Sequence, residues 1–313
     1  MTASVLIGLL AGIASGLLFF LPLPSFIAGI GWGWRTAALA GATAAILLTS
    51  ILALRAGAVH LIAFGIPVTF VCWLAFLNRP KPGVASATTA GTSIEWYPVG
   101  RVIAWLAFMA GGLAGIAVLA VATDYESYTT AIKSALNDNA IRQLEIVVGK
   151  TFSSEDRAAF VELVVRAYPG MLAILWLGLM LSSLWMAGRI VQASGRLKRA
   201  WPEISTMEFP AATPLIFVAS LAATLVPGLL GVIAGGVASA LAFAYLVMGL
   251  AVVHCVTRGN TFRAMILIAI YLAIVVLGQF AVVPLTILGV GEPLFRLRDR
   301  IGTATPSNGR PNK

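Results

Sequence analysis

The sequence predicts an all-α integral membrane protein, a polytopic bundle of about eight or nine transmembrane helices. Of its 313 residues, 59% are hydrophobic and only 11% are charged, whereas soluble domains carry roughly 25% charged residues. The apolar residues also come in blocks of about 20 without a charge, which is the length that crosses a bilayer core. The lipid bilayer is therefore the expected environment of the chain.

The apolar blocks give the predicted spans in order. Residues 1–34 are one apolar stretch that Pro22 and Pro24 divide into a helix, a bend and a shorter helix, because proline removes a backbone donor. Residues 1–302 then form a single transmembrane domain, and residues 303–313 have the composition of a disordered tail. The remaining spans are expected at residues 36–54, 59–77, 102–122, 170–186, 211–226, 231–256 and 262–288, the last interrupted by Pro284.

One charged segment, residues 124–166, interrupts the apolar pattern. It contains seven acidic and five basic residues and so lies outside the hydrocarbon. Ile132 and Leu136 recur at helical spacing, and the residues from Ser153 to Asp156 form a capping pattern for a helix start. We expect a short extramembrane insertion of two amphipathic helices.

The net charge of +9 does not predict a nucleic-acid partner, because the 21 basic residues are spread over short loops and chain ends. Such residues set the orientation of a membrane protein instead. Counted over alternate loops, one side carries ten and the other eleven. Short loops favour the first side as cytoplasmic, but the arginine-rich tail then faces the other way. Either Pro284 marks a re-entrant turn or the span count is wrong by one.

The sequence lacks the residues that several classes of chemistry require. No predicted span carries Asp, Glu or Lys near its centre, which speaks against a proton pump with a buried carboxylate. No P-loop, nucleophile elbow or dinucleotide fingerprint is present, and His60 and His254 have no second ligand at helical spacing. We therefore expect no enzyme, no cofactor and no metal site.

Glycines at four-residue spacing indicate close helix packing. Small residues at this spacing let helix backbones approach each other in lipid. Packing within the chain is favoured over a dimerisation face. The residues are Gly8, Gly12, Gly16, Gly111, Gly115, Gly231 and Gly235.

A ligand site is predicted from broken helices and isolated polar residues. Prolines that interrupt spans expose backbone carbonyls, which transporters use to bind ligands near the middle of the membrane. Gln279 is the one long polar side chain well inside a predicted span, although it fits a contact between helices equally well. The candidate ligand-binding residues are Pro22, Pro24, Trp32, Gln279 and His254.

Short motifs near both ends carry a family resemblance. They are Phe-Leu-Pro-Leu-Pro at residues 20–24, Gly-Ile-Gly-Trp-Gly at 29–33, Tyr-Leu-Val-Met-Gly-Leu-Ala-Val at 245–252, Gly-Val-Gly-Glu at 289–292 and Arg-Leu-Arg-Asp-Arg at 296–300. The sequence resembles the YybS-like family of predicted bacterial membrane proteins, whose function is unknown. The resemblance implies a multi-pass protein of the bacterial inner membrane. Part of the N-terminal pattern is similar to the substrate-binding subunits of energy-coupling-factor vitamin transporters.

Two functions remain open. The first is a transporter-like bundle that binds a small molecule and has no ATPase of its own. The alternative is a membrane scaffold that docks a protein partner through residues 124–166 and the basic loop at residues 189–203. An enclosed site with converging polar groups would favour the first function. An exposed apolar stripe on the extramembrane helices would favour the second.

Overall fold

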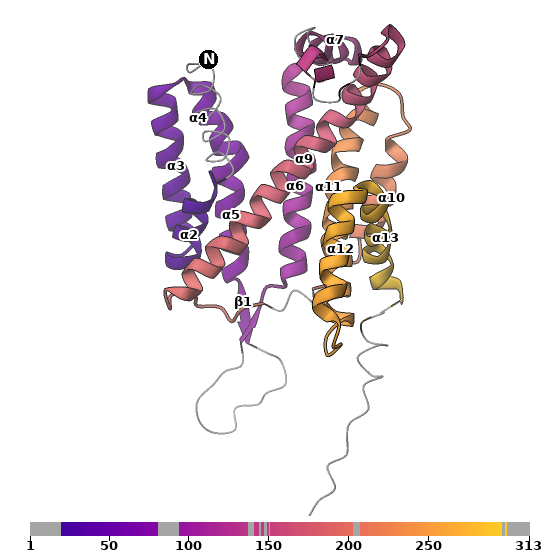
Figure 1. The fold of residues 1–313 in the computed structure, drawn as a ribbon. Coiled ribbons are helices and arrows are strands. Elements are labelled where there is room, and N and C mark those ends of the chain that lie inside the picture. The colour runs from indigo at the N-terminus through magenta and orange to yellow at the C-terminus, as the bar shows by residue number, and fades with distance from the viewer. Residues whose placement is uncertain are drawn as a thin grey trace, which may run out of the picture. The chain divides into compact units, whose positions relative to one another are not determined.

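The chain is almost entirely helical in the computed structural model (Figure 1). The structure describes residues 20–80, 94–136, 141–143, 145, 146, 149, 151–202, 207–295 and 298. Two compact units share these residues. Unit 1 consists of Met1–Leu113 and Leu172–Pro202, and unit 2 consists of Ala114–Met171 and Glu203–Lys313.

Five helical stretches in the described residues are long and apolar enough to cross a membrane. The fold class is thus confirmed as an all-α membrane protein, whereas the predicted number of eight or nine spans is not confirmed. The five are α3 (Trp34–Ile51), the stretch Leu54–Phe76, α6 (Val99–Val121), α9 (Ser154–Ala193) and α11 (Leu229–Val256). α6 and α9 each pass from one unit into the other.

Unit 1 starts with α2 (Leu23–Trp32), the short helix expected after the proline bend. Pro22 and Pro24 stand at its beginning, where a missing N–H group costs nothing. After α3, the stretch Leu54–Phe76 comprises α4 (Leu54–His60), the π-helical turn η1 (Leu61–Gly65) and α5 (Ile66–Phe76). Then β1 (Asn78–Pro80) and β2 (Ile94–Trp96) form an antiparallel pair.

Pro67 explains why the backbone departs from a regular helix around η1. Proline has no N–H to donate to the carbonyl four residues earlier, which here is Ala63. The Nε1 of Trp176 on α9 donates to the Ala63 oxygen at 2.8 Å instead. A side chain of a second helix therefore satisfies the carbonyl that the proline leaves open.

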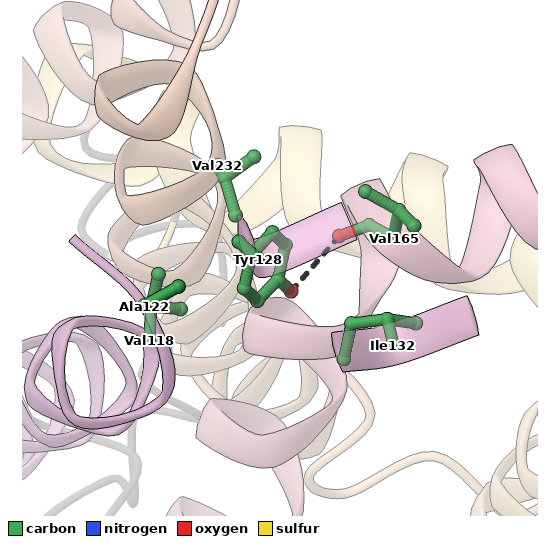
Figure 2. Close-up of a cluster of buried hydrophobic side chains, with 6 residues drawn as sticks. All are labelled: Val118, Ala122, Tyr128, Ile132, Val165 and Val232. Carbon is green, nitrogen blue, oxygen red and sulfur yellow. Dashed lines mark hydrogen bonds between the residues drawn. The ribbon is translucent and has the colours of Figure 1, made fainter. Parts of the chain in front are cut away.

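The charged insertion begins with α7 (Tyr125–Ala135), whose N-cap Asp124 accepts a hydrogen bond from the Ser127 amide. Its apolar face packs inside unit 2, as Figure 2 shows: Tyr128 and Ile132 lie in one buried cluster that also contains residues of α6, α9 and α11. The predicted amphipathic helix is present, and its apolar side is covered by the chain itself. The other cluster members are Val118, Ala122, Val165 and Val232.

The second amphipathic helix predicted in the insertion is not separate, because it is the first part of the 40-residue helix α9. Its start is as predicted, since Ser153 Oγ accepts from the Asp156 amide and Asp156 Oδ2 accepts from the Ser153 amide. Pro169 lies inside α9 without ending it. The carbonyl that this proline leaves open belongs to Val165, and the Tyr128 hydroxyl donates to it at 3.0 Å (Figure 2).

Unit 2 continues with α10 (Thr213–Ala223), α11, α12 (Arg263–Leu277) and α13 (Gln279–Phe295). The predicted last span, residues 262–288, is wrong: the chain breaks at Gly278, and Pro284 lies inside α13. Gly278 has φ +53, a conformation that glycine adopts without steric cost. α12 and α13 therefore lie side by side as a hairpin (Figure 1).

α13 packs closely on α11 through two glycines. A Cβ at Gly249 would overlap the Leu285 carbonyl, and a Cβ at Gly289 would overlap the Tyr245 carbonyl. Only glycine permits this approach of two backbones. Residues 245–252 and 289–292, two of the motifs that carry the family resemblance, thus meet in space.

Candidate functional site

The end of α13 contains a buried ion pair. Glu292 is 4% exposed, and its Oε1 accepts from Arg298 Nε at 2.6 Å. A second nitrogen of the Arg298 guanidinium donates to the Met207 carbonyl at 3.0 Å. The pair therefore joins the end of α13 to the segment that precedes α10, and the arginine neutralises the carboxylate.

Three buried polar atoms of unit 2, one of them in this pair, have no hydrogen-bond partner in the structure. They are Glu292 Oε2, Tyr245 Oη and Thr213 Oγ1. Tyr245 is fully buried and Thr213 is 1% exposed. Each buried unpaired group costs about 1–3 kcal/mol, and native proteins pair the large majority of such atoms. With Arg157 Nε, the described residues of unit 2 contain four such atoms, and the three named here require an explanation.

The segment from Met207 to Phe217 brings these groups into one region of unit 2. Phe209 and Phe217 hold the Tyr245 ring at centroid distances of 5.2 and 5.3 Å. Thr213 lies midway between the two phenylalanines in the sequence, and Met207, two residues before Phe209, contacts Arg298. We call Glu292, Arg298, Tyr245 and Thr213 the polar site of unit 2.

The polar site offers hydrogen bonds but no net charge. Glu292 Oε2 is an acceptor, and the two hydroxyls both donate and accept. The aromatic rings of Phe209 and Phe217 supply apolar contacts beside them. These groups suit a small neutral or zwitterionic molecule with a hydrogen-bond donor, because an unpaired ionic ligand would bring uncompensated charge into the bundle. In the described ranges no three His, Cys, Asp or Glu residues are grouped as metal ligands.

The five residues proposed from the sequence as ligand-binding are dispersed over the fold. Pro22 and Pro24 begin α2, and Trp32 ends it, 57% exposed. His254 lies near the end of α11, where its Nε2 and the Tyr271 hydroxyl of α12 are 3.0 Å apart. Gln279 is exposed at the turn between α12 and α13.

The predicted packing glycines have different roles. Gly111 and Gly115 are buried in α6, and a Cβ at Gly115 would lie 3.1 Å from the Ile233 side chain. A Cβ at Gly231 would overlap the Val226 carbonyl of the preceding turn, whereas one at Gly235 would have ordinary space. The predicted residues Gly8, Gly12 and Gly16 lie outside the described residues.

A comparison with protein-family models gives one match, which covers residues 1–291 and is described as a predicted membrane protein. The chain belongs to this family, DUF2232. The matched region includes Thr213, Tyr245 and Gly289, and it ends one residue before Glu292. The comparisons with curated proteins and with solved structures give no match. The similarity to subunits of energy-coupling-factor transporters stays a prediction.

Sequence reasoning did not select any member of the polar site as a ligand residue. Glu292, Arg298 and Tyr245 entered the sequence analysis within motifs of the family resemblance, Arg298 also in the count of basic residues, and Thr213 lies in an apolar block. One signal was available: Glu292 follows a predicted span with only Gly289, Val290 and Gly291 between them. A carboxylate so close to an apolar block needs a partner.

Proposed function

We propose that this integral membrane protein binds a small neutral or zwitterionic molecule in the polar site of unit 2, as a transporter-like, non-enzymatic bundle without its own ATPase. The observation that carries the proposal is the set of three buried, unpartnered polar atoms beside a buried ion pair. A ligand that pairs with them offsets the cost of leaving them unpaired.

A purely structural role explains these atoms less well. Glu292 and Arg298 link α13 to the segment before α10, and one carboxylate oxygen suffices for that link. The Tyr245 and Thr213 hydroxyls contribute no bond to the fold, so phenylalanine and valine would serve packing at least as well. Residues that reduce stability without contributing a bond are typical of binding sites.

The proposal is tested by a thermal-shift assay on the purified protein in detergent. Wild type is incubated with fractionated small-molecule extracts of the host, and the unfolding midpoint is compared with that of Thr213→Val. We expect a fraction to stabilise wild type by about 2.7 kcal/mol at one hundred times its dissociation constant, and to stabilise Thr213→Val much less. Without ligand, Thr213→Val is expected to be at least as stable as wild type.

The matched control is Thr286→Val on α13. Its hydroxyl already donates to the Val282 carbonyl at 3.0 Å, so its loss has no reason to change ligand response. Equal stabilisation of wild type and Thr213→Val by every active fraction would contradict the proposed site. A loss of stability in ligand-free Thr213→Val would show a structural hydroxyl instead.

The alternative scaffold function has less support. The apolar side chains of α7, Tyr128 and Ile132, are covered by the chain's own residues, so α7 offers no apolar stripe to a partner, and the exposed large apolar side chains in the described part of the insertion are Leu163 and Ile146.

We further propose a bacterial inner membrane as the location, with the insertion outside the cytoplasm. Val232, near the start of α11, packs against Tyr128 of the insertion, so α11 runs away from the insertion's side. The Gly278 turn then returns Arg298 to the side of Arg258 and Arg263. In unit 1 taken by itself, seven described basic side chains lie at one end and Arg55 at the other, which supports a cytoplasmic basic end of that unit.

A further inference from the structure

One end of unit 1 has a strong positive charge. The end comprises the α2–α3 turn, the end of α5, the β1–β2 pair, the start of α6 and the end of α9 (Figure 1). Glu95 is the single acidic side chain among the described residues of unit 1, and Arg55, at the α3–α4 turn, is the single basic one at the opposite end. The basic end carries Arg35, Arg79, Arg101, Arg189, Arg196, Lys198 and Arg199.

Three of these arginines lie over tryptophan rings. The guanidinium carbons of Arg196, Arg189 and Arg35 are 4.9, 5.2 and 5.6 Å from the ring centroids of Trp32, Trp201 and Trp34. Stacking of this kind orients a guanidinium without neutralising it, so its charge stays available to an anion. The tryptophans themselves are typical of the headgroup level of a membrane.

A groove of about 310 Å³ opens at this end, between the β1–β2 pair and the start of α6. Arg79, Arg101 and Glu95 line it, together with Asn78 and Tyr97. Glu95 accepts from Arg79 Nε at 2.8 Å, which leaves the terminal nitrogens of that guanidinium for a second acceptor. The groove is large enough for a phosphate group, and its two arginines outnumber its one carboxylate.

A second groove of unit 1, of about 430 Å³, is almost wholly apolar. It extends along α3 and α5 from Trp34 and Trp73 to Leu61 and Gly65. Leu61 and Trp73 lie about 18 Å apart along the helix axis at 1.5 Å per residue, which is close to the depth of one leaflet, about 15 Å. An acyl chain fits the length and the chemistry of this groove.

Aromatic side chains connect the two grooves. Phe70 of the apolar groove lies edge-on to Trp105 of α6, with ring centroids 5.6 Å apart. Trp105 Nε1 in turn donates to the hydroxyl of Tyr97, which lines the polar groove, at 3.3 Å. One amphipathic molecule can therefore occupy both grooves, with its polar end at the basic end of unit 1.

We propose that unit 1 binds an anionic phospholipid, with the headgroup phosphate between Arg79 and Arg101 and one acyl chain in the apolar groove. A soluble anion would use only the polar groove, and a protein partner would not need an apolar groove one leaflet deep. The second acyl chain stays in the bilayer. This site is separate from the polar site of unit 2 and does not depend on the function proposed for it.

Native mass spectrometry of the full chain, titrated in detergent with phosphatidylglycerol or phosphatidylcholine, tests the proposal. We expect the anionic lipid to bind more tightly. Arg101→Gln should weaken the binding of phosphatidylglycerol by about tenfold, because it removes one charge-assisted contact. The affinity for phosphatidylcholine should stay unchanged. Ala38→Phe, which fills the apolar groove, should weaken both lipids.

The matched controls are Arg55→Gln at the opposite end and Leu39→Phe, whose side chain is 67% exposed beside the groove. Neither should change lipid binding. Equal affinity for the two lipids, or an equal effect of Arg55→Gln and Arg101→Gln, would overturn the proposal. Inorganic phosphate that displaces the lipid, combined with no effect of Ala38→Phe, would identify an anion site without a lipid and would also overturn it.

Discussion

At two described prolines, Pro67 and Pro169, each inside a helical stretch long enough to cross a membrane, a single side chain replaces the missing backbone bond. Trp176 donates to the Ala63 carbonyl left open by Pro67, and Tyr128 donates to the Val165 carbonyl left open by Pro169. Both donors belong to a different helix from the carbonyl they satisfy. Each proline therefore fixes a contact between helices as well as a local distortion.

Replacing Trp176 by phenylalanine should destabilise the protein. The ring is kept, but the partly buried Ala63 carbonyl loses its donor, at a cost of about 1–3 kcal/mol. The unfolding midpoint in detergent measures this, with Trp185→Phe on the same helix as the control because Trp185 is 54% exposed. Equal midpoints for the two variants would show that the hydrogen bond contributes nothing.

Tyr128 predicts a pH dependence of the extramembrane insertion. Burial raises the pKa of its hydroxyl to about 12, above the value of about 10 for an unfolded chain. The stabilisation that the buried, protonated Tyr128 hydroxyl gives to the folded state is therefore complete below pH 10 and is lost as the pH rises toward 12. The exchange rate of α7 amides, divided at each pH by the intrinsic base-catalysed rate, should rise in this range for wild type. For Tyr128→Phe this ratio should begin higher and stay constant with pH, so an identical rise in the variant would contradict the assignment.

At the scale of elements, the α12–α13 hairpin depends on Gly278. The residue has φ +53, where a side chain costs about 1–3 kcal/mol. Gly278→Ala should lower the unfolding midpoint, while Pro284→Ala, inside α13, should leave it unchanged or raise it. If the proline variant is the more damaging of the two, the turn lies at Pro284, as the sequence had suggested.

The elements that the sequence predicted correctly are those with a local signal. Uninterrupted apolar blocks gave α3, α6 and α11 to within a few residues, and the Ser153–Asp156 cap marked the start of α9. The hairpin was missed because its turn contains no charged residue or proline. A hydropathy pattern also does not report the backbone angle φ that Gly278 adopts in the turn. The polar site was missed because the sequence does not show whether a buried hydroxyl has a hydrogen-bond partner.

At the scale of the whole molecule, the hairpin moves Arg298 from one side of the count of basic residues to the other. Because the apolar block at residues 262–288 contains a turn, the chain comes back to the side of the membrane from which α12 started. Arg298 therefore lies on the same side as Arg258 and Arg263. Within unit 2, the end of α13 then lies on the side opposite the insertion, and we propose that this side is cytoplasmic.

Cysteine accessibility tests this orientation. A thiol at Arg263→Cys should react with an impermeant reagent only from the cytoplasmic side, and one at Lys133→Cys only from the opposite side, since both positions are exposed. Wild type, which contains Cys72 and Cys255, gives the background. Labelling of both variants from the same side would contradict the crossing of α9 or α11.

The central claim is that the polar site of unit 2 holds a small molecule. The most direct measurement is native mass spectrometry of the full chain released from its own membrane without added ligand. The account predicts a bound small molecule on wild type and on Thr286→Val, and its absence from the double variant Thr213→Val and Tyr245→Phe. The same bound mass on the double variant, or a bare wild type whose ligand-free stability exceeds that of the double variant, would contradict it.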